Sequence, residues 1–63
     1  MTRLLRPDEV ARRLAISRSA VYRMAARGEI PHLRFGRRLV RFDPELLERW
    51  LAGRVRGDGR DSG

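Results

Sequence analysis

The chain has 63 residues, with 15 arginines, no lysine, no cysteine and a formal net charge of +7. A chain of this length buries only about 60 % of the surface it exposes when unfolded, so it forms one small domain without room for an enclosed catalytic pocket. Without cysteine, and with His32 as its one histidine, it offers no disulfide, no thiolate and no convincing zinc site, so we expect no enzyme, no metal and no other cofactor.

A first helix is expected from Pro7 to about Ala15. Proline suits the first turn of a helix, where its missing N–H is not needed, and the two acidic residues after it lie at the positive end of the helix dipole. Arg6, at the N-cap position, is a poor capping residue, so this end is expected to fray. The apolar spacing predicts one buried face, formed by Val10, Ala11 and Leu14.

A second helix is expected to begin almost at once, with Ser17 as its N-cap. Gly28, with Pro31 close behind, suits the position just after its end. The expected buried face consists of Val21, Met24 and Ala25, and the expected exposed face consists of Arg18, Ser19, Tyr22, Arg23 and Ala26. Because only Ile16 and its immediate neighbours separate the two short helices, they must cross at a steep angle, which is the geometry of a helix-turn-helix.

The segment His32–Phe42 changes from helical periodicity to alternation, which predicts a β-hairpin. Its tip is expected to be Gly36-Arg37-Arg38. The alternation predicts a basic face and an apolar face, the latter formed by Leu33, Phe35, Val40 and Phe42. Leu39 is an exception to this pattern, because it is an apolar residue on the basic face.

A closing helix is expected after Asp43-Pro44-Glu45, which supplies an N-cap, a proline at the first position and an acid in the first turn. Its apolar stripe is Leu46, Leu47, Trp50 and Leu51, which a small domain needs for its core, although Trp50 could instead anchor a partner. Gly53 ends this helix. Residues 54–63 are rich in glycine and charge, so we expect a folded domain over 1–53 and a disordered tail over 54–63.

These elements predict a mostly α fold with a small β-hairpin, that is, a winged helix-turn-helix, to which a short strand at Arg3–Leu5 could add an edge. The charge predicts a polyanionic partner, because residues 1–53 hold twelve arginines against six acidic residues. Arginine can donate two hydrogen bonds to guanine, and serine and tyrosine hydroxyls can reach phosphates or base edges. The candidate DNA-binding residues of the second helix and its ends are Ser17, Arg18, Ser19, Tyr22, Arg23 and Arg27.

The hairpin supplies a second basic surface that can follow a phosphate strand or enter a narrow minor groove. Its candidate DNA-binding residues are Arg34, Arg37, Arg38 and Arg41. Two blander interpretations remain open: a solvated polar helix face, and a charged hairpin edge that prevents sheet-to-sheet aggregation.

The sequence favours DNA binding over two other classes of function. A membrane-active cationic peptide needs one continuous amphipathic helix, whereas glycines and prolines divide this chain into short pieces. A protein-only adaptor would use the Trp50 stripe and need no DNA. No apolar run approaches the ~20 residues that span a bilayer, and the first six residues contain no apolar stretch of signal-peptide length. We therefore expect no membrane partner and a cytoplasmic protein, associated with the nucleoid when it is bound to DNA.

The sequence resembles the excisionase family of small MerR-like winged-helix DNA-binding proteins. The resemblance spans about residues 4–52 and lies in five runs, Leu5–Ala11, Leu14–Arg23, Arg27–Pro31, Arg34–Arg38 and Phe42–Leu51. The family usually has threonine or serine where this chain has Arg6, and glycine in the turn where it has Ala15. Because a positive φ is strained for alanine, we expect a slightly different backbone at that turn.

The resemblance implies that Arg18, Ser19, Tyr22 and Arg23 face the major groove and that Arg37 and Arg38 form the wing contacts. The family includes recombination directionality factors, which bind repeated sites cooperatively, bend DNA and help an integrase to excise a mobile element. Other members resemble plain transcription regulators. The expected partners are double-stranded DNA, further copies of the chain bound head to tail on it, and an integrase. Full-length MerR regulators add a long dimerising helix and a ligand-binding domain, which do not follow Gly53, so no small-molecule effector is expected.

Overall fold

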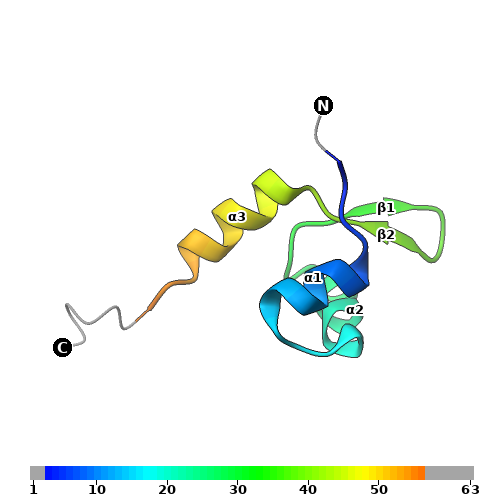
Figure 1. Cartoon of the computed structure of the whole chain (residues 1–63). Helices are drawn as coiled ribbons and strands as arrows, with labels where there is room; N and C mark the ends of the chain where they lie inside the picture. The colour runs from blue at the N-terminus through cyan, green and yellow to red at the C-terminus, as the bar shows by residue number, and fades with distance from the viewer. Residues whose placement is uncertain (1–2, 57–63) are drawn as a thin grey trace.

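The computed structural model describes residues 3–56 and contains the predicted elements in the predicted order (Figure 1). The helices and strands are α1 (Pro7–Leu14), α2 (Arg18–Ala26), β1 (Leu33–Phe35), β2 (Leu39–Arg41) and α3 (Pro44–Gly53). The strands form a two-stranded antiparallel sheet, the wing, that lies between the helix-turn-helix and α3 in the sequence. This arrangement confirms the winged helix-turn-helix architecture.

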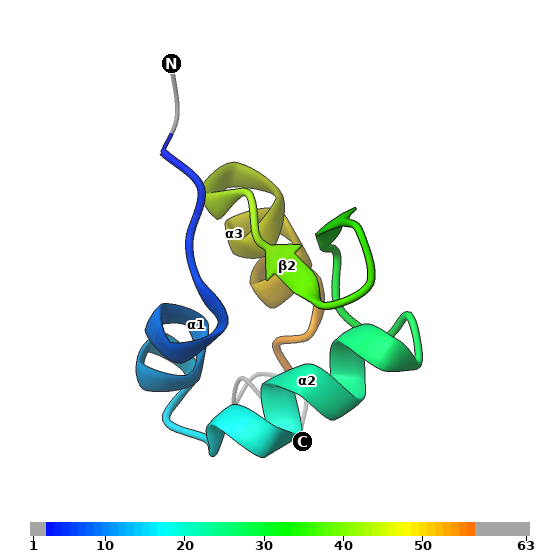
Figure 2. The ribbon, with the colours of Figure 1, turned by 90° about the vertical axis from the view of Figure 1, so that its right-hand side faces the viewer.

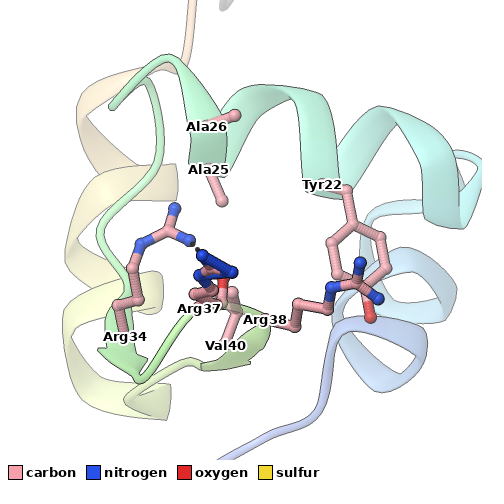
Figure 3. Close-up of a pocket in the computed structure, with 7 residues that line it drawn as sticks. All are labelled: Tyr22, Ala25, Ala26, Arg34, Arg37, Arg38 and Val40. Atoms are coloured by element: carbon pink, nitrogen blue, oxygen red, sulfur yellow. Dashed lines mark hydrogen bonds between the residues drawn. The ribbon is translucent and has the colours of Figure 1, made fainter.

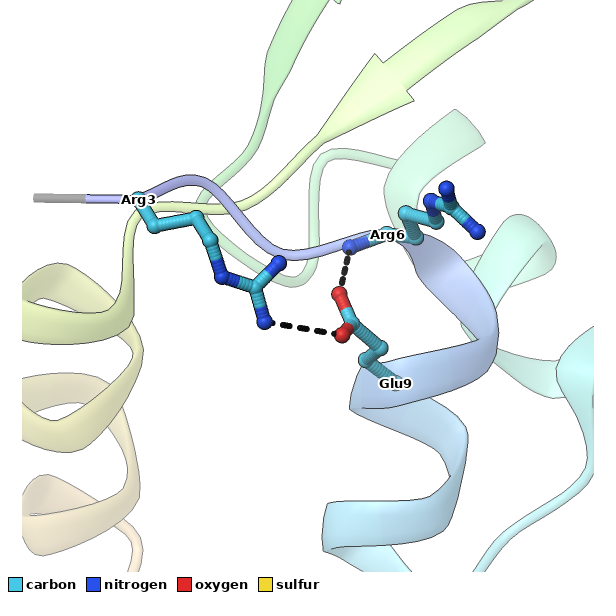
Figure 4. Close-up of polar contacts among 3 residues, drawn as sticks. All are labelled: Arg3, Arg6 and Glu9. Atoms are coloured by element: carbon cyan, nitrogen blue, oxygen red, sulfur yellow. Dashed lines mark hydrogen bonds and ion pairs between the residues drawn. The ribbon is translucent and has the colours of Figure 1, made fainter.

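Helix α1 begins at Pro7, and a carboxylate supplies the cap that Arg6 lacks (Figure 4). One Glu9 oxygen accepts the backbone N–H of Arg6 at 2.8 Å, and the other accepts from the Arg3 guanidinium at 3.0 Å. The Arg6 N–H and then the Arg3 guanidinium lower the pKa of the Glu9 carboxyl, because both interact favourably with its charged form. The prediction of a frayed start considered only the Arg6 side chain and missed this contact.

The turn between α1 and α2 depends on a left-handed residue. Ala15 has φ 60° and ψ 42°, and its N–H bonds to the last turn of α1. The expectation of a different backbone at this alanine is therefore wrong, because Ala15 adopts the conformation that glycine usually supplies. Ser17 then caps α2, its Oγ accepting the N–H of Ala20 at 3.0 Å. The short connection makes the two helices cross steeply (Figure 2).

The register of the wing overturns the predicted division into apolar and basic faces. Directly opposed residues share a face of an antiparallel pair, and Arg34 lies opposite Val40. Val40 is buried, so Arg34 shares the inner face with it. The opposite, outer face carries an apolar strip, which we define as Leu33, Phe35 and Leu39, with exposed fractions of 38 %, 49 % and 49 %.

The length of the turn explains why the predicted apolar and basic faces of the wing are wrong. The loop at residues 36–38 begins with Gly36 at φ 82°, and it pairs Phe35 with Leu39 directly. The side chains alternate along each strand as predicted, but the register of a hairpin depends on the geometry of its turn, and a shift by one residue exchanges the faces of a strand. The same register explains Leu39, which is not an exception but a member of the apolar strip.

The core joins all parts of the domain. Its buried apolar residues come from both helices of the helix-turn-helix, from the connection before the wing, from β2 and its end, and from α3; they are Val10, Ala11, Val21, Ala25, Ile30, Val40, Phe42 and Leu47. Trp50 and Leu51 pack against this core, as predicted, whereas Leu46 is exposed. An ion pair between Arg13 of α1 and Glu48 links α3 to the helix-turn-helix.

The start of the folded unit differs from the prediction in detail. The expected edge strand is a single antiparallel bridge, in which Leu5 and Phe42 exchange backbone hydrogen bonds of 2.8 and 2.9 Å. Past α3, the exposed residues Arg54–Arg56 have no regular strand or helix, and the Arg54 guanidinium lies 4.7 Å from the centre of the Trp50 ring. The remainder of the predicted tail, residues 57–63, lies outside the described residues.

Candidate nucleic-acid interface

Helix α2 presents the polar face that its sequence predicts. Val21 and Ala25 are buried and Met24 packs against the core, which turns the opposite side of the helix to solvent. The exposed side chains are those of Arg18, Ser19, Tyr22, Arg23 and Ala26. A nine-residue helix that exposes arginine and hydroxyl groups along one side can place hydrogen-bond donors against base edges in a major groove.

The wing places its arginines in two different settings. Arg37 and Arg38 lie in the exposed loop at the tip, after Gly36 reverses the chain. Arg34 lies on the inner face beside Val40, where its Nη1 donates a long hydrogen bond of 3.4 Å to the Arg37 carbonyl oxygen. The tip is therefore free to meet a ligand, whereas Arg34 faces the space between the wing and α2.

That space is a cleft of about 450 Å³, which we call the α2–wing cleft (Figure 3). One wall belongs to α2 and the other to the wing; the lining residues are Tyr22, Ala25, Ala26, Arg34, Arg37, Arg38 and Val40. Figure 3 shows the Arg38 side chain extending from the wing towards the end of the cleft where Tyr22 lies. The lining contains three guanidiniums and no carboxylate, so the cleft concentrates positive charge.

The ion pairs within residues 3–56 leave this surface unneutralised. They join Arg3 to Glu9, Arg13 to Glu48 and Arg27 to Glu29. Within the same range, the arginines that line the cleft and those on the exposed side of α2 form no ion pair with a carboxylate. The positive charge of α2 and of the wing is therefore available to a ligand at the place where these two elements meet.

Six predicted site residues do not line the cleft. Three of them, Arg18, Ser19 and Arg23, lie on the exposed side of α2, and the other three are Ser17, Arg27 and Arg41. Ser17 uses its Oγ as the acceptor of the α2 cap, which leaves its O–H free to donate. Arg27 follows α2, and its Nη1 lies 3.8 Å from Oε2 of Glu29. Arg41 is half-buried on the outer face of the wing, and its Nη1 donates to the Val40 carbonyl oxygen at 2.8 Å.

Ala26 lines the cleft, although the sequence did not identify it as a candidate site residue. The sequence did predict its place on the exposed side of α2. It lies one helical turn after Tyr22, on the same side of α2, and its small side chain leaves the cleft open. The signal was available, because an alanine four residues after an exposed tyrosine shares its face. The sequence could not predict that the wing lies opposite this alanine, because that depends on the register of the wing.

The described part of the chain, residues 3–56, shows neither a membrane span nor a cluster of metal ligands. No helix in it has the length and apolarity needed to cross a membrane. No group of three or more histidine or acidic side chains in residues 3–56 is gathered as metal ligands would be.

Comparison with known proteins assigns the fold to a family. Residues 4–55 match the model of a family described as a helix-turn-helix domain, which covers most of the chain. No curated protein and no solved structure gave a significant match. The matched range contains α1, α2, the wing and α3, together with the α2–wing cleft. The chain therefore belongs to the helix-turn-helix domain family, and its function is DNA binding.

Proposed function

We propose that the protein binds double-stranded DNA sequence-specifically, with α2 in the major groove and the wing along the adjacent backbone or minor groove. The observation that carries this proposal is the shared orientation of two basic surfaces. Tyr22 and Ala26 on the exposed side of α2 line the same cleft as three arginines of the wing, and no carboxylate lines it (Figure 3). Arg18 and Arg23 lie on that same exposed side of α2. A helix for base contacts beside a cationic ribbon for phosphate contacts separates recognition from affinity.

The biological role that we infer is that of an excisionase, or recombination directionality factor. In this role the protein binds repeated sites on chromosomal DNA in the cytoplasm, bends the DNA and directs an integrase towards excision. The resemblance of residues 4–52 to that family supports the role. The alternative is a small MerR-like transcription regulator without an effector domain, which would use the same interface.

The experiment that tests these proposals is selection of fragmented host genomic DNA by the purified protein, followed by sequencing. Enrichment of closely spaced repeats beside an integrase gene, or at the ends of a mobile element, is expected for an excisionase. Enrichment at promoters scattered through the chromosome would support the transcription regulator and remove the recombination role. Recovery without any enriched sequence would contradict sequence-specific binding.

Head-to-tail self-association on DNA is part of the same proposal. The apolar strip on the outer face of the wing supports it, because three adjacent exposed apolar side chains point away from both the core and the α2–wing cleft. A second copy that covers this strip would leave the DNA-binding surface of the first copy free. One short recognition helix gives limited affinity, so contacts between neighbouring copies would favour binding at repeated sites.

Cooperativity on a duplex that carries several enriched sites tests this association. The wild-type protein is expected to bind with a Hill coefficient above one, and Phe35→Thr is expected to reduce it to one with little change in affinity for a single site. Leu46→Thr, at an exposed leucine of α3, is the matched control for loss of surface apolarity. A Hill coefficient of one for the wild-type chain would remove the self-association.

A further inference from the structure

The α2–wing cleft exists because α2 carries two alanines where it passes the wing. Ala25 is buried and Ala26 is exposed, and both line the cleft together with Tyr22 one turn earlier. A longer side chain at either position would reach towards the wing. Core packing explains the small side chain of the buried Ala25 but not that of Ala26, because the core does not require a small side chain at an exposed position.

Arg34 lies within this cleft in a setting that suits an anion. Its place opposite the buried Val40 holds it on the inner face of the wing, whereas Arg37 and Arg38 lie in the loop at the tip; all three arginines are exposed. Among the described residues, its guanidinium makes one long hydrogen bond, to the Arg37 carbonyl oxygen at 3.4 Å, and no ion pair. A guanidinium has five N–H donors, so most of its hydrogen-bonding capacity remains for a ligand.

The cleft also concentrates like charges. Arg34, Arg37 and Arg38 all line it, and no acidic side chain does so. Their mutual repulsion is unfavourable in the free protein and is relieved when an anion enters between them. The remaining polar group in the lining, the Tyr22 hydroxyl, can donate to the same anion.

We propose that the α2–wing cleft clamps a phosphodiester of one DNA strand, with Arg34 as its principal ligand and with the small side chain of Ala26 as the condition for its entry. This inference rests on the proposed function and identifies which part of the DNA occupies the cleft. In a duplex the phosphate backbone separates the major from the minor groove, so a helix in one groove and a wing beside it must straddle a backbone. The cleft between them is the position where that backbone has to pass.

The chemistry of the lining favours a phosphate over a base. Guanidinium forks match phosphate oxygens in geometry and charge. The lining holds three guanidiniums against one aromatic ring, that of Tyr22, so it offers more groups that suit a phosphate than groups on which a base could stack. Clamping one backbone from both sides would fix the depth of α2 in the major groove.

The first test measures the salt dependence of binding to a 30-base-pair duplex of random sequence. Each phosphate contact contributes a slope of about −0.9 in a plot of log affinity against log salt. Arg34→Gln is expected to make the slope shallower by about 0.9 and to weaken binding roughly tenfold. Arg49→Gln removes an exposed arginine from α3, outside the cleft lining, and is expected to leave the slope unchanged.

The second test fills the cleft without changing charge. Ala26→Leu is expected to weaken binding roughly tenfold or more, whereas Ala26→Ser, which stays small, is expected to bind as the wild type does. Ala52→Leu places the same bulk at an exposed position of α3 and serves as the control. Circular dichroism and thermal unfolding must show that each variant keeps the wild-type fold, which the exposure of both positions favours.

The third test locates the contact on the DNA. Replacement of single phosphates by uncharged methylphosphonates in a duplex selected from the genome is expected to weaken wild-type binding at one or two adjacent positions. At those positions the substitution is expected to cost the Arg34→Gln variant little, because the contact is already lost. This loss of additivity is the signature of a direct pair.

The outcomes separate the clamp from the proposed function. Wild-type affinity and slope for both Arg34→Gln and Ala26→Leu would overturn the clamp while DNA binding stands. Equal changes for Arg34→Gln and Arg49→Gln would also overturn it, because they would show a general effect of charge. Failure of the wild-type chain itself to bind duplex DNA with salt dependence would instead refute the proposed function.

Discussion

Ala15 carries the backbone strain of the helix-turn-helix. At φ 60° and ψ 42° its Cβ lies close to a neighbouring carbonyl oxygen, which costs an L-residue roughly 1–2 kcal/mol. Glycine avoids this cost but loses more conformational entropy on folding, by roughly 0.5–1 kcal/mol. The turn needs the left-handed conformation because it must end α1 and bring Ser17 to the start of α2 within two residues.

Replacement of Ala15 by glycine is therefore expected to stabilise the protein. We expect Ala15→Gly to raise the free energy of unfolding by roughly 0.5–1 kcal/mol, the difference between the strain relieved and the entropy added. Urea denaturation followed by circular dichroism measures this change. Ala52→Gly, in the right-handed backbone of α3, is the matched control and is expected to lower the same free energy by a similar amount. Equal destabilisation by both substitutions would contradict the strain at Ala15.

At the scale of the element, the start of α1 depends on the charge of one carboxylate. The backbone N–H of Arg6 and the Arg3 guanidinium lower the pKa of Glu9 below its ordinary value of 4.5. A carboxyl with a lowered pKa in the folded state contributes stability that is fully present above the ordinary value. That contribution is lost as the pH falls through the lowered pKa of the folded state.

We accordingly expect the wild-type protein to lose stability as the pH is lowered below about 4.5. Glu9→Gln keeps an oxygen that can accept the Arg6 N–H but does not titrate, so this variant should lose less over the same range. Thermal unfolding of both proteins between neutral pH and pH ~3 measures the difference. Parallel stability profiles for the two proteins would show that Glu9 makes no such contribution.

Loss of an arginine from α2 and loss of one from the wing should change DNA binding in different ways. Arg23 lies on the exposed side of α2, so Arg23→Ala is expected to reduce discrimination between DNA sequences by about 1–3 kcal/mol at the base pair concerned. Arg37 lies at the tip of the wing, so Arg37→Ala is expected to weaken all duplexes alike and to reduce the salt slope by about 0.9.

Parallel titrations of an enriched site and of a scrambled duplex with both variants measure this difference. If both variants lost affinity without any change in sequence preference, α2 would not be the recognition helix. The comparison is matched, since each variant removes one exposed arginine and leaves the buried core unchanged.

At the scale of the whole molecule, two phenylalanines distinguish the core from the outer surface. Phe42 is fully buried where the bridge to Leu5, the wing and α3 meet, whereas Phe35 is half-exposed in the apolar strip. Phe42→Ala is expected to cost roughly 3–5 kcal/mol, which would unfold much of so small a domain. Phe35→Ala is expected to cost less than about 1 kcal/mol. Chemical denaturation of the two variants tests this, and similar losses would contradict the register of the wing.

The sequence by itself predicted each helix, the hairpin and their order, because local signals define them. Pro7 and Pro44 mark helix starts, Ser17 and Asp43 supply caps, and Gly28 follows the end of α2 at φ 70°. These signals act within a few residues and so can be read without the rest of the chain. The exposed side of α2 could be predicted for the same reason, since apolar spacing along one helix defines its two faces.

The tertiary structure decided how the elements face one another. The turn at residues 36–38 set the register that places Arg34 beside Val40 and turns Leu33 and Phe35 outward. Only the approach of the wing to α2 made Ala26 the wall of a cleft and separated Arg41 from the other wing arginines. Pairing across strands and packing between elements join residues that are distant in the chain, and no periodicity within one segment encodes which residue meets which.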